Sequence, residues 1–198
     1  MEGGGDSAEG KAHLRRGMSE FLRSLREAAR QKRLQWKVVA CGSRNDAHDA
    51  FLDSTKKSPD AINVLLVDSE GPAANSLSPR THLIQRDGWD LAGIGEDSVH
   101  LMIQTMEAWI IADAGAVAKY YGQHFLKNAL PAAQNLEGIG KTSVQNGLAR
   151  ATAPTQKKEY HKIRDAAALL ARIDPEIVRC RCPSCDRLFA TLAQAIEA

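Results

Sequence analysis

The chain has 198 residues, of which 43% are hydrophobic and 25% charged, and its formal net charge at pH 7 is +2. These values are those of an ordinary globular protein with one substantial core. No apolar run approaches the length that spans a bilayer, so we expect no membrane partner. The acidic, glycine-rich start is unlike a secretory signal, and we therefore expect a cytoplasmic protein.

The charges are unevenly distributed along the chain. Basic residues crowd the segment 11–37 and return between 157 and 187, whereas acidic residues concentrate in the middle. This asymmetry suits a protein that holds a metal centrally and meets a polyanion with flanking positive surface. For any single basic cluster, a solvated helix face is the simpler interpretation.

The spacing of apolar residues predicts alternating helices and strands in the first half of the chain. In order, we expect a helix over 9–34, a strand over 35–41, a helix over 44–55, a buried strand over 61–67 and a short helix over 80–86. The rest of 72–98 is expected to be loop.

The second half is predicted to be mainly helical after one more strand. We expect that strand over 99–104, a loop over 128–140, and helices over 106–112, 114–121, 142–151, 161–172 and 183–197. The alternation predicts an α/β fold with a mostly parallel sheet sandwiched by helices. We expect a single domain, 1–198, with an α/β core (1–104) and a helical extension (105–198).

Three of the four cysteines, Cys180, Cys182 and Cys185, are spaced closely enough to suggest zinc. A structural zinc ion needs four ligands, and neither Cys41 nor a histidine follows at a usual spacing. Reduced thiols in a cytoplasmic protein are the favoured interpretation.

Asp68 and Glu70 directly follow the buried strand predicted over 61–67. Ligands of parallel sheets bind beyond the carboxyl ends of the strands, and two residues apart in an extended segment project to the same side. Two adjacent carboxylates repel unless a cation lies between them, and hard oxygen ligands suit Mg²⁺ or Mn²⁺. A turn with no ligand explains Asp-Ser-Glu-Gly-Pro equally well.

The N-terminal segment Glu2-Gly3-Gly4-Gly5 offers a second candidate site. Consecutive glycines let backbone N–H groups approach a phosphate or let a carboxylate reach a metal. A disordered terminus is the alternative.

Glu107 interrupts an apolar stretch and is therefore expected to be partly buried, where a carboxylate needs a partner or a metal. A helix-start carboxylate or an ion pair with arginine would explain it too. Asp113 lies six residues later, on a different side of the helix, so we prefer Glu107 as the accessory ligand.

Gly140-Lys141-Thr142 lacks the earlier glycine and the preceding strand of a phosphate-binding loop, so we reject that motif. Lys141, His161 and Lys162 remain candidates for phosphate contact, with solvated surface as the alternative for each.

Three segments together resemble the bacterial domain-of-unknown-function 4276 family. They are Glu-Gly-Gly-Gly-Asp from Glu2, Leu-Leu-Val-Asp-Ser-Glu ending at Glu70, and His-Leu-Met-Ile-Gln-Thr-Met-Glu-Ala-Trp-Ile-Ile-Ala-Asp ending at Asp113. Further matches are Arg-Asp-Gly-Trp at 86–89, Tyr-Tyr-Gly at 120–122 and Tyr-His-Lys at 160–162. The core of this family is similar to Toprim domains, which occur in topoisomerases, primases and overcoming-lysogenization-defect nucleases.

The resemblance implies a fold and site residues. A Toprim domain has a glutamate after its first strand, which Glu2 matches, and an Asp-x-Asp after a later strand. Asp68 matches the first aspartate of that pair and Glu70 takes the second position, with a longer arm. Relatives carry a short apolar strand before the first glutamate, and no such strand precedes Glu2 in this sequence. Glu107 lies in a Glu-x-Trp segment that recurs in RloB-like proteins.

Residues and resemblance together predict a Mg²⁺- or Mn²⁺-dependent nuclease or related phosphoryl-transfer enzyme. Glu2, Asp68 and Glu70 would be acid/base groups and metal ligands, with Lys162 assisting catalysis. We expect nucleic acid as the partner (DNA or RNA, including tRNA), and kinship adds an ATPase partner and phage defence. A homo-oligomer is a further candidate partner arrangement. The alternatives are a catalytically inactive module that binds nucleic acid or an ATPase, and a phosphatase for small substrates.

Overall fold

The computed structural model describes residues 1–73 and 77–198. In this part of the chain, helices surround one pair of parallel strands, β1 (Leu65–Asp68) and β2 (Val99–Met102). Leu65 pairs with Val99 and Asp68 with Met102. Every residue of both strands is buried, as expected when both faces of a sheet are covered. The chain thus has a mixed α/β fold.

Helices occupy most of the remaining chain. Those before β2 are α1 (Ala8–Phe21), α2 (Arg23–Gln31), α3 (Arg44–Lys57) and α4 (Pro79–Asp87). Those after it are α5 (Met106–Ala112), α6 (Ala114–Tyr121), α7 (Lys141–Thr152), α8 (Lys162–Leu170), α9 (Pro175–Arg181) and α10 (Pro183–Glu197). Short 3₁₀ turns cover Glu96–Ser98, Lys127–Ala129 and Leu136–Gly138.

Most helices lie where the sequence predicted them. The bounds of α5, α6 and α10 are as expected, and α7 and α8 differ by one or two residues at each end. The long helix predicted over 9–34 is instead two helices, which divide at Leu22. The prediction missed α9, although Asp174 caps its first turn and Pro175 is its first residue, a typical start signal.

The prediction of a regular strand over 35–41 was wrong. This segment is extended, but in the described part of the chain its backbone pairs across only with Met1, and Gly42 directly after it pairs with Gly3. The ammonium of Met1 donates to the carbonyl of Val39 at 2.7 Å, and Gly3 and Gly42 exchange backbone hydrogen bonds of 2.8 and 3.1 Å. Backbone pairing that ends after so few residues does not form a regular β-ladder. In the described residues the sheet therefore consists of β1 and β2, smaller than expected.

The strands predicted over 61–67 and 99–104 form but are shorter, four residues each. The loop predicted over 72–98 includes residues 74–76, which lie outside the described residues, and the helix within it is α4. None of the described helices is both long and apolar enough to cross a membrane.

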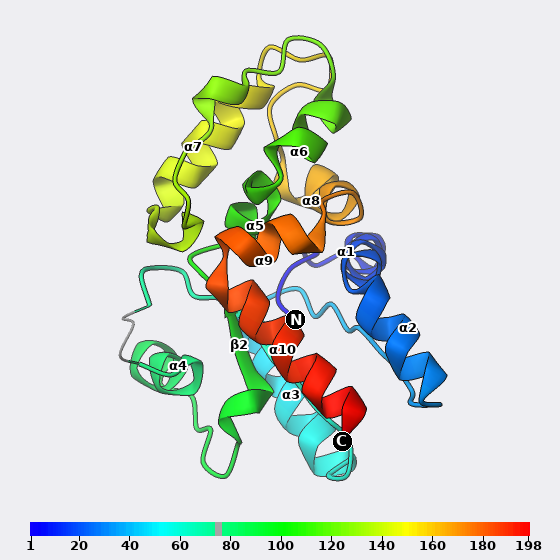
Figure 1. The fold of residues 1–198 in the computed structure, drawn as a ribbon. Coiled ribbons are helices and arrows are strands. Elements are labelled where there is room, and N and C mark those ends of the chain that lie inside the picture. Colours follow the sequence, from blue (N-terminus) through cyan, green and yellow to red (C-terminus); the bar gives the residue numbers. More distant parts are fainter. Residues whose placement is uncertain (74–76) are drawn as a thin grey trace.

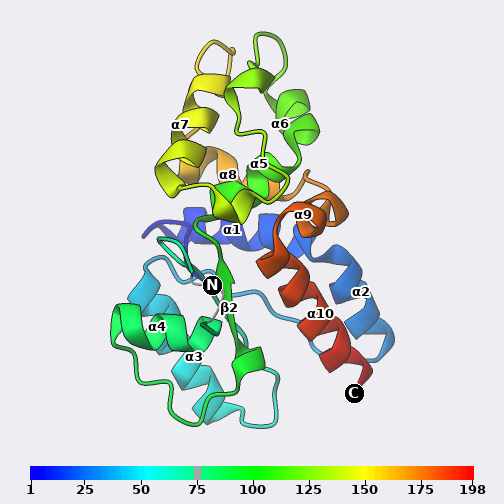
Figure 2. The ribbon, with the colours of Figure 1, turned by 60° about the vertical axis from the view of Figure 1, so that its left-hand side comes forward.

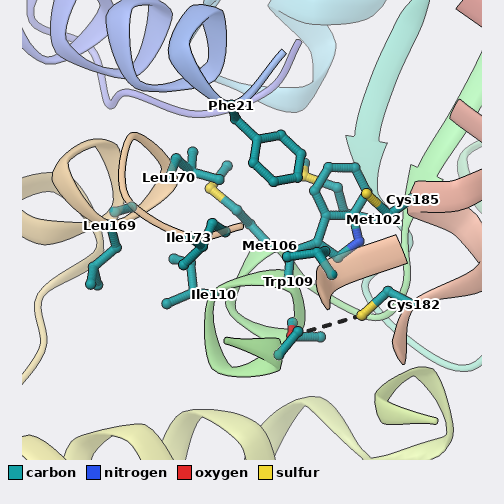
Figure 3. Close-up of a cluster of buried hydrophobic side chains, with 14 of the residues drawn as sticks. Phe21, Met102, Met106, Trp109, Ile110, Leu169, Leu170, Ile173, Cys182 and Cys185 are labelled. Atoms are coloured by element: carbon teal, nitrogen blue, oxygen red, sulfur yellow. Dashed lines mark hydrogen bonds between the residues drawn. The ribbon is translucent and has the colours of Figure 1, made fainter. Parts of the chain in front are cut away.

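The larger hydrophobic cluster lies around α5, every residue of which is buried. Trp109 of α5 packs against Phe21 of α1 with ring centroids 5.8 Å apart, and Phe21 meets Phe189 of α10 edge-on at 5.7 Å. Figure 3 shows Trp109 among side chains from both halves of the chain, including Cys182 and Cys185. This packing fixes the start of α5 next to the end of β1.

The helices lie on different sides of the strand pair. Figures 1 and 2 show α6 and α7 together at one end of the molecule and α3 and α4 near the other. In both views the N-terminus lies near the strand pair, and Glu2 donates its backbone N–H to Leu66 of β1 at 3.1 Å. The first residues of the chain therefore reach the carboxyl end of the strands.

Candidate functional site

Three carboxylates from distant parts of the sequence meet at the end of β1. Glu2, Asp68 and Glu70 each offer an oxygen that lies within 4.8 Å of the other two. Asp68 is buried, and the other two are partly exposed. The sequence predicted this group, and the structure brings all three members together.

Glu2 is held by its neighbours on both sides. Its backbone N–H donates a hydrogen bond to the carbonyl of Leu66 in β1, and the following residue, Gly3, pairs with Gly42. The Glu2 side chain accepts a hydrogen bond from the backbone N–H of Asp68 at 3.2 Å. The N-terminal segment is thus ordered, and its carboxylate points at the end of the strand.

Asp68 is the last residue of β1 and is 1% exposed. One carboxylate oxygen accepts from the backbone N–H of Met106, the first residue of α5, at 2.8 Å. The other accepts from Nζ of Lys162 at 2.9 Å. This carboxylate therefore links the strand to the start of two helices.

Glu70 lies two residues beyond the strand with a φ of +63°, a left-handed conformation that is uncommon for a residue other than glycine. Its N–H donates to the carbonyl of Gln104 at 3.0 Å, and its carboxylate accepts from Nζ of Lys141. The buried Gln104 side chain also accepts the N–H of Lys141 at 3.0 Å. Gln104, which sequence reasoning missed, therefore holds both members of this ion pair.

Each carboxylate of the cluster has its own cation. Glu2 lies 3.3 Å from Arg44, Asp68 lies 2.9 Å from Lys162, and Glu70 pairs with Lys141. We call these six residues the acid–base cluster. Three negative and three positive side chains leave it with no net charge.

Arg44 was not among the predicted site residues. Its guanidinium makes two hydrogen bonds to Asp87, of 2.9 and 2.8 Å, and one to the backbone carbonyl of Asp68. It also lies over the ring of Trp89, 5.1 Å from the centroid. The Arg-Asp-Gly-Trp segment at 86–89 therefore has a structural role, which is to hold Arg44 against the cluster.

All three cations of the cluster share an unusual position. Arg44, Lys141 and Lys162 are the first residues of α3, α7 and α8. Basic side chains are disfavoured there, because the helix dipole places partial positive charge at the N-terminus. A basic residue directly after a predicted helix start is the sequence signal that would have found Arg44.

Burial and neighbouring charges set the ionisation of the cluster. Burial raises the pKa of Asp68 to about 6 even though Lys162 opposes the shift. For Lys162, burial favours the neutral amine, but the Asp68 and Glu107 carboxylates outweigh it and raise the pKa. The pKa of Glu70 is lowered, since the hydrogen bond and charge of Lys141 outweigh its burial. The Asp68 carboxyl thus has a pKa raised towards neutrality.

Glu107 does not belong to the group of three carboxylates within 4.8 Å. It is buried, as expected, and its two oxygens accept hydrogen bonds from the hydroxyls of Thr105 and of Tyr160, the latter at 3.0 Å. Its negative charge helps to keep Lys162 protonated. The geometry thus gives Glu107 a supporting position beside the cluster.

The predicted glycines Gly3, Gly4 and Gly5 line a small cavity of about 250 Å³ that also touches Glu2 and Lys162. All three have positive φ angles, and a Cβ atom on Gly4 would lie 2.8 Å from the backbone of α1. Close packing against α1 therefore requires glycine at this position.

Among the described residues, the candidate His161 and the residues set aside from the sequence, Asp113 and the C-terminal cysteines, make none of the contacts of the acid–base cluster given above. His161 is exposed, and its backbone N–H donates to the Asp165 carboxylate at 2.9 Å. Asp113 caps α6 by accepting from Ala116 at 2.9 Å. Cys182 and Cys185 are buried thiols, whereas Cys180 is exposed.

The donor set suits a hard divalent cation. Ligand oxygens about 2.1 Å from an octahedral Mg²⁺ ion are themselves about 3 to 4 Å apart. The observed limit of 4.8 Å requires only a small inward movement of Glu2 and Glu70, the two more exposed members. The residues present therefore fit Mg²⁺ or Mn²⁺, provided that the lysines give up their carboxylate contacts.

By its fold and its site, the chain is a mixed α/β protein with a cluster of carboxylates at the carboxyl end of a parallel strand pair. The chain belongs to the family described as domain of unknown function DUF4276, whose sequence model matches residues 1–193. No curated protein and no solved structure shows significant similarity to the chain.

Proposed function

We propose that the protein is a Mg²⁺- or Mn²⁺-dependent nuclease, or a closely related phosphoryl-transfer enzyme, of Toprim type. The observation that carries this proposal is the meeting of Glu2, Asp68 and Glu70 within 4.8 Å, with two lysines in contact with them. Carboxylates can bind a metal ion and neighbouring ammonium groups can bind a phosphate, so this arrangement suits a metal-bound phosphate ester.

The three carboxylates would hold the cation, and the metal, when bound, polarises the phosphoryl group and activates a water. Lys141 and Lys162 offer positive charge to the phosphoryl oxygens. A group with a pKa of about 6, such as Asp68, can exchange a proton at neutral pH. Arg44 keeps Glu2 oriented towards the strand end.

The test is cleavage of DNA, RNA and tRNA by the purified protein with Mg²⁺ or Mn²⁺. Asp68→Asn keeps the shape of the side chain and removes its charge. We expect the rate to fall about a hundredfold or more, since even residues that only support metal ligands typically contribute about 10- to 100-fold.

The matched control is Asp53→Asn, on the exposed surface of α3, where Asp53 pairs with Lys57 and with no other side chain in the described part of the protein. It should cleave as the wild type does. Equal product from wild type and Asp68→Asn, with both folded by circular dichroism, would exclude this site as the source of activity.

One observation favours a second candidate, a catalytically inactive module that binds nucleic acid or an ATPase subunit. Each carboxylate of the cluster already has a side-chain cation, so the cluster is neutral without a metal. Such a module would keep its affinity for its partner in chelator and cleave nothing with any metal. Turnover of a generic phosphate ester without affinity for polynucleotide would instead indicate a small-substrate phosphatase.

A further inference from the structure

The three cations of the acid–base cluster are held very differently. Arg44 contacts Asp87, the carbonyl of Asp68 and the Trp89 ring in addition to Glu2, and its side chain is only 14% exposed. It has a fixed position whether or not Glu2 stays beside it.

Among the described residues, the ammonium group of Lys141 donates one hydrogen bond, to Glu70, and that of Lys162 donates one, to Asp68. Their side chains are 30% and 40% exposed. A lysine on a flexible four-carbon stem can change partner by rotating its side chain. These two cations can therefore leave the carboxylates, whereas Arg44 cannot.

A divalent cation that takes the carboxylates would deprive Lys141 and Lys162 of the carboxylate oxygens to which they now donate. Both lysines would then stand at the N-termini of α7 and α8, where the helix dipole is positive. With the metal present and the carboxylates unchanged, the formerly neutral cluster would carry two extra positive charges. An anion with several oxygens, such as a phosphoryl group, removes this penalty.

We propose that a divalent cation and a phosphoryl group bind this site as a coupled pair, with Lys141 and Lys162 moving from carboxylate oxygens to phosphoryl oxygens. This inference rests on the proposed function, because it uses the same metal site. It assigns the two lysines a switching role: they hold the cluster neutral until substrate and metal arrive together. Metal alone binds weakly, and so does the phosphoryl ligand alone.

The experiment measures Mn²⁺ binding by electron paramagnetic resonance of the free ion. Titrations are run without ligand, with a cleavage-resistant phosphorothioate dinucleotide as diester, and with a nucleoside 5′-monophosphate as monoester. We expect one of these to tighten Mn²⁺ binding about tenfold or more, within the usual range of coupling between sites. By linkage, Mn²⁺ must tighten binding of that ligand by the same factor. The arm that responds identifies the ester class.

Lys141→Gln is the diagnostic variant. It removes the competitor of Glu70, so Mn²⁺ alone should bind more tightly than to wild type, while the coupling factor falls towards one. A lysine with a merely structural role would not produce these opposite changes. The matched control is Lys56→Gln, an exposed lysine near the far end of α3, which should leave both values unchanged.

Two outcomes overturn the inference in different ways. If Mn²⁺ binds wild type, is lost in Glu70→Gln, and is unaffected by either ligand, the coupling is wrong but the metal site of the proposed function stands. If Mn²⁺ does not bind in any arm, with or without a ligand, or binds Glu70→Gln as it binds wild type, the metal site itself fails and the proposed function fails with it.

Discussion

Lys162 at the start of α8 donates a hydrogen bond of 2.9 Å to Asp68 at the end of β1, across 94 residues of sequence. This contact joins the C-terminal helical part of the chain to the strand pair at the candidate site. Any change that moves α8 or alters the ionisation of Asp68 therefore acts on the same place.

The raised pKa of Asp68 predicts a specific pH dependence of stability. The folded state holds this proton more tightly than the unfolded state, because burial raises the pKa from 3.8 to about 6. The stabilisation is complete below pH 3.8 and is lost as the pH rises through about 6. A shift of about two pKa units corresponds to roughly 3 kcal/mol.

The measurement is the free energy of unfolding in urea between pH 4 and 7 for wild type and Asp68→Asn. The difference between wild type and variant should fall by up to about 3 kcal/mol as the pH rises. Carboxylates remote from Asp68 cancel in this difference. A difference that is constant or rises with pH contradicts the assignment of the raised pKa.

Arg44→Lys should destabilise the fold although it keeps the charge. Lysine cannot reproduce the two parallel bonds to Asp87 or the stacking on Trp89. Losing hydrogen bonds to a charged partner costs about 1.5–3 kcal/mol, measurable by denaturant unfolding. Arg16→Lys, on the exposed face of α1, should change stability by less than about 0.5 kcal/mol. Equal stability of the two variants would show that Arg44 has no such anchoring role.

Tyr160→Phe should destabilise the protein through Glu107. The Tyr160 hydroxyl donates at 3.0 Å to this buried carboxylate, and an unsatisfied buried acceptor costs about 1–3 kcal/mol. Tyr120→Phe is the matched control, since that hydroxyl makes a long bond of 3.4 Å to Asp165, which Arg164 also neutralises. Thermal unfolding should rank Tyr160→Phe clearly below Tyr120→Phe, and the reverse order would refute this account.

Gly17→Ala should disturb the contact between α1 and α8. A Cβ atom on Gly17 would lie 2.3 Å from the carbonyl oxygen of Ala167, so the helices must separate. Overpacking of this kind costs about 1–3 kcal/mol, and Lys162 should move with α8. Gly138→Ala, where a Cβ atom meets nothing within 4 Å, is the control in the same unfolding assay. A fully stable Gly17→Ala protein would show that this close approach is not required.

Local patterns predicted the elements around the site well. The apolar run before Asp68 indicated a buried strand, and the Met106–Ala112 helix has the expected bounds. Patterning was less reliable for the segment 35–41, because an apolar extended stretch becomes a regular strand only where a long neighbour supplies backbone partners. Among the described residues, this segment and Gly42 after it pair through their backbone only with Met1 and Gly3.

By itself the sequence determined which carboxylates follow a buried strand and which family the chain belongs to, because both follow from local order of residues. Only the tertiary structure decided their partners. Arg44, Lys141 and Lys162 meet the cluster across 42, 71 and 94 residues, and no periodicity encodes such distant contacts. The packing of α3, α7 and α8 around the strand end brings these opposite charges together, and thereby makes the cluster neutral.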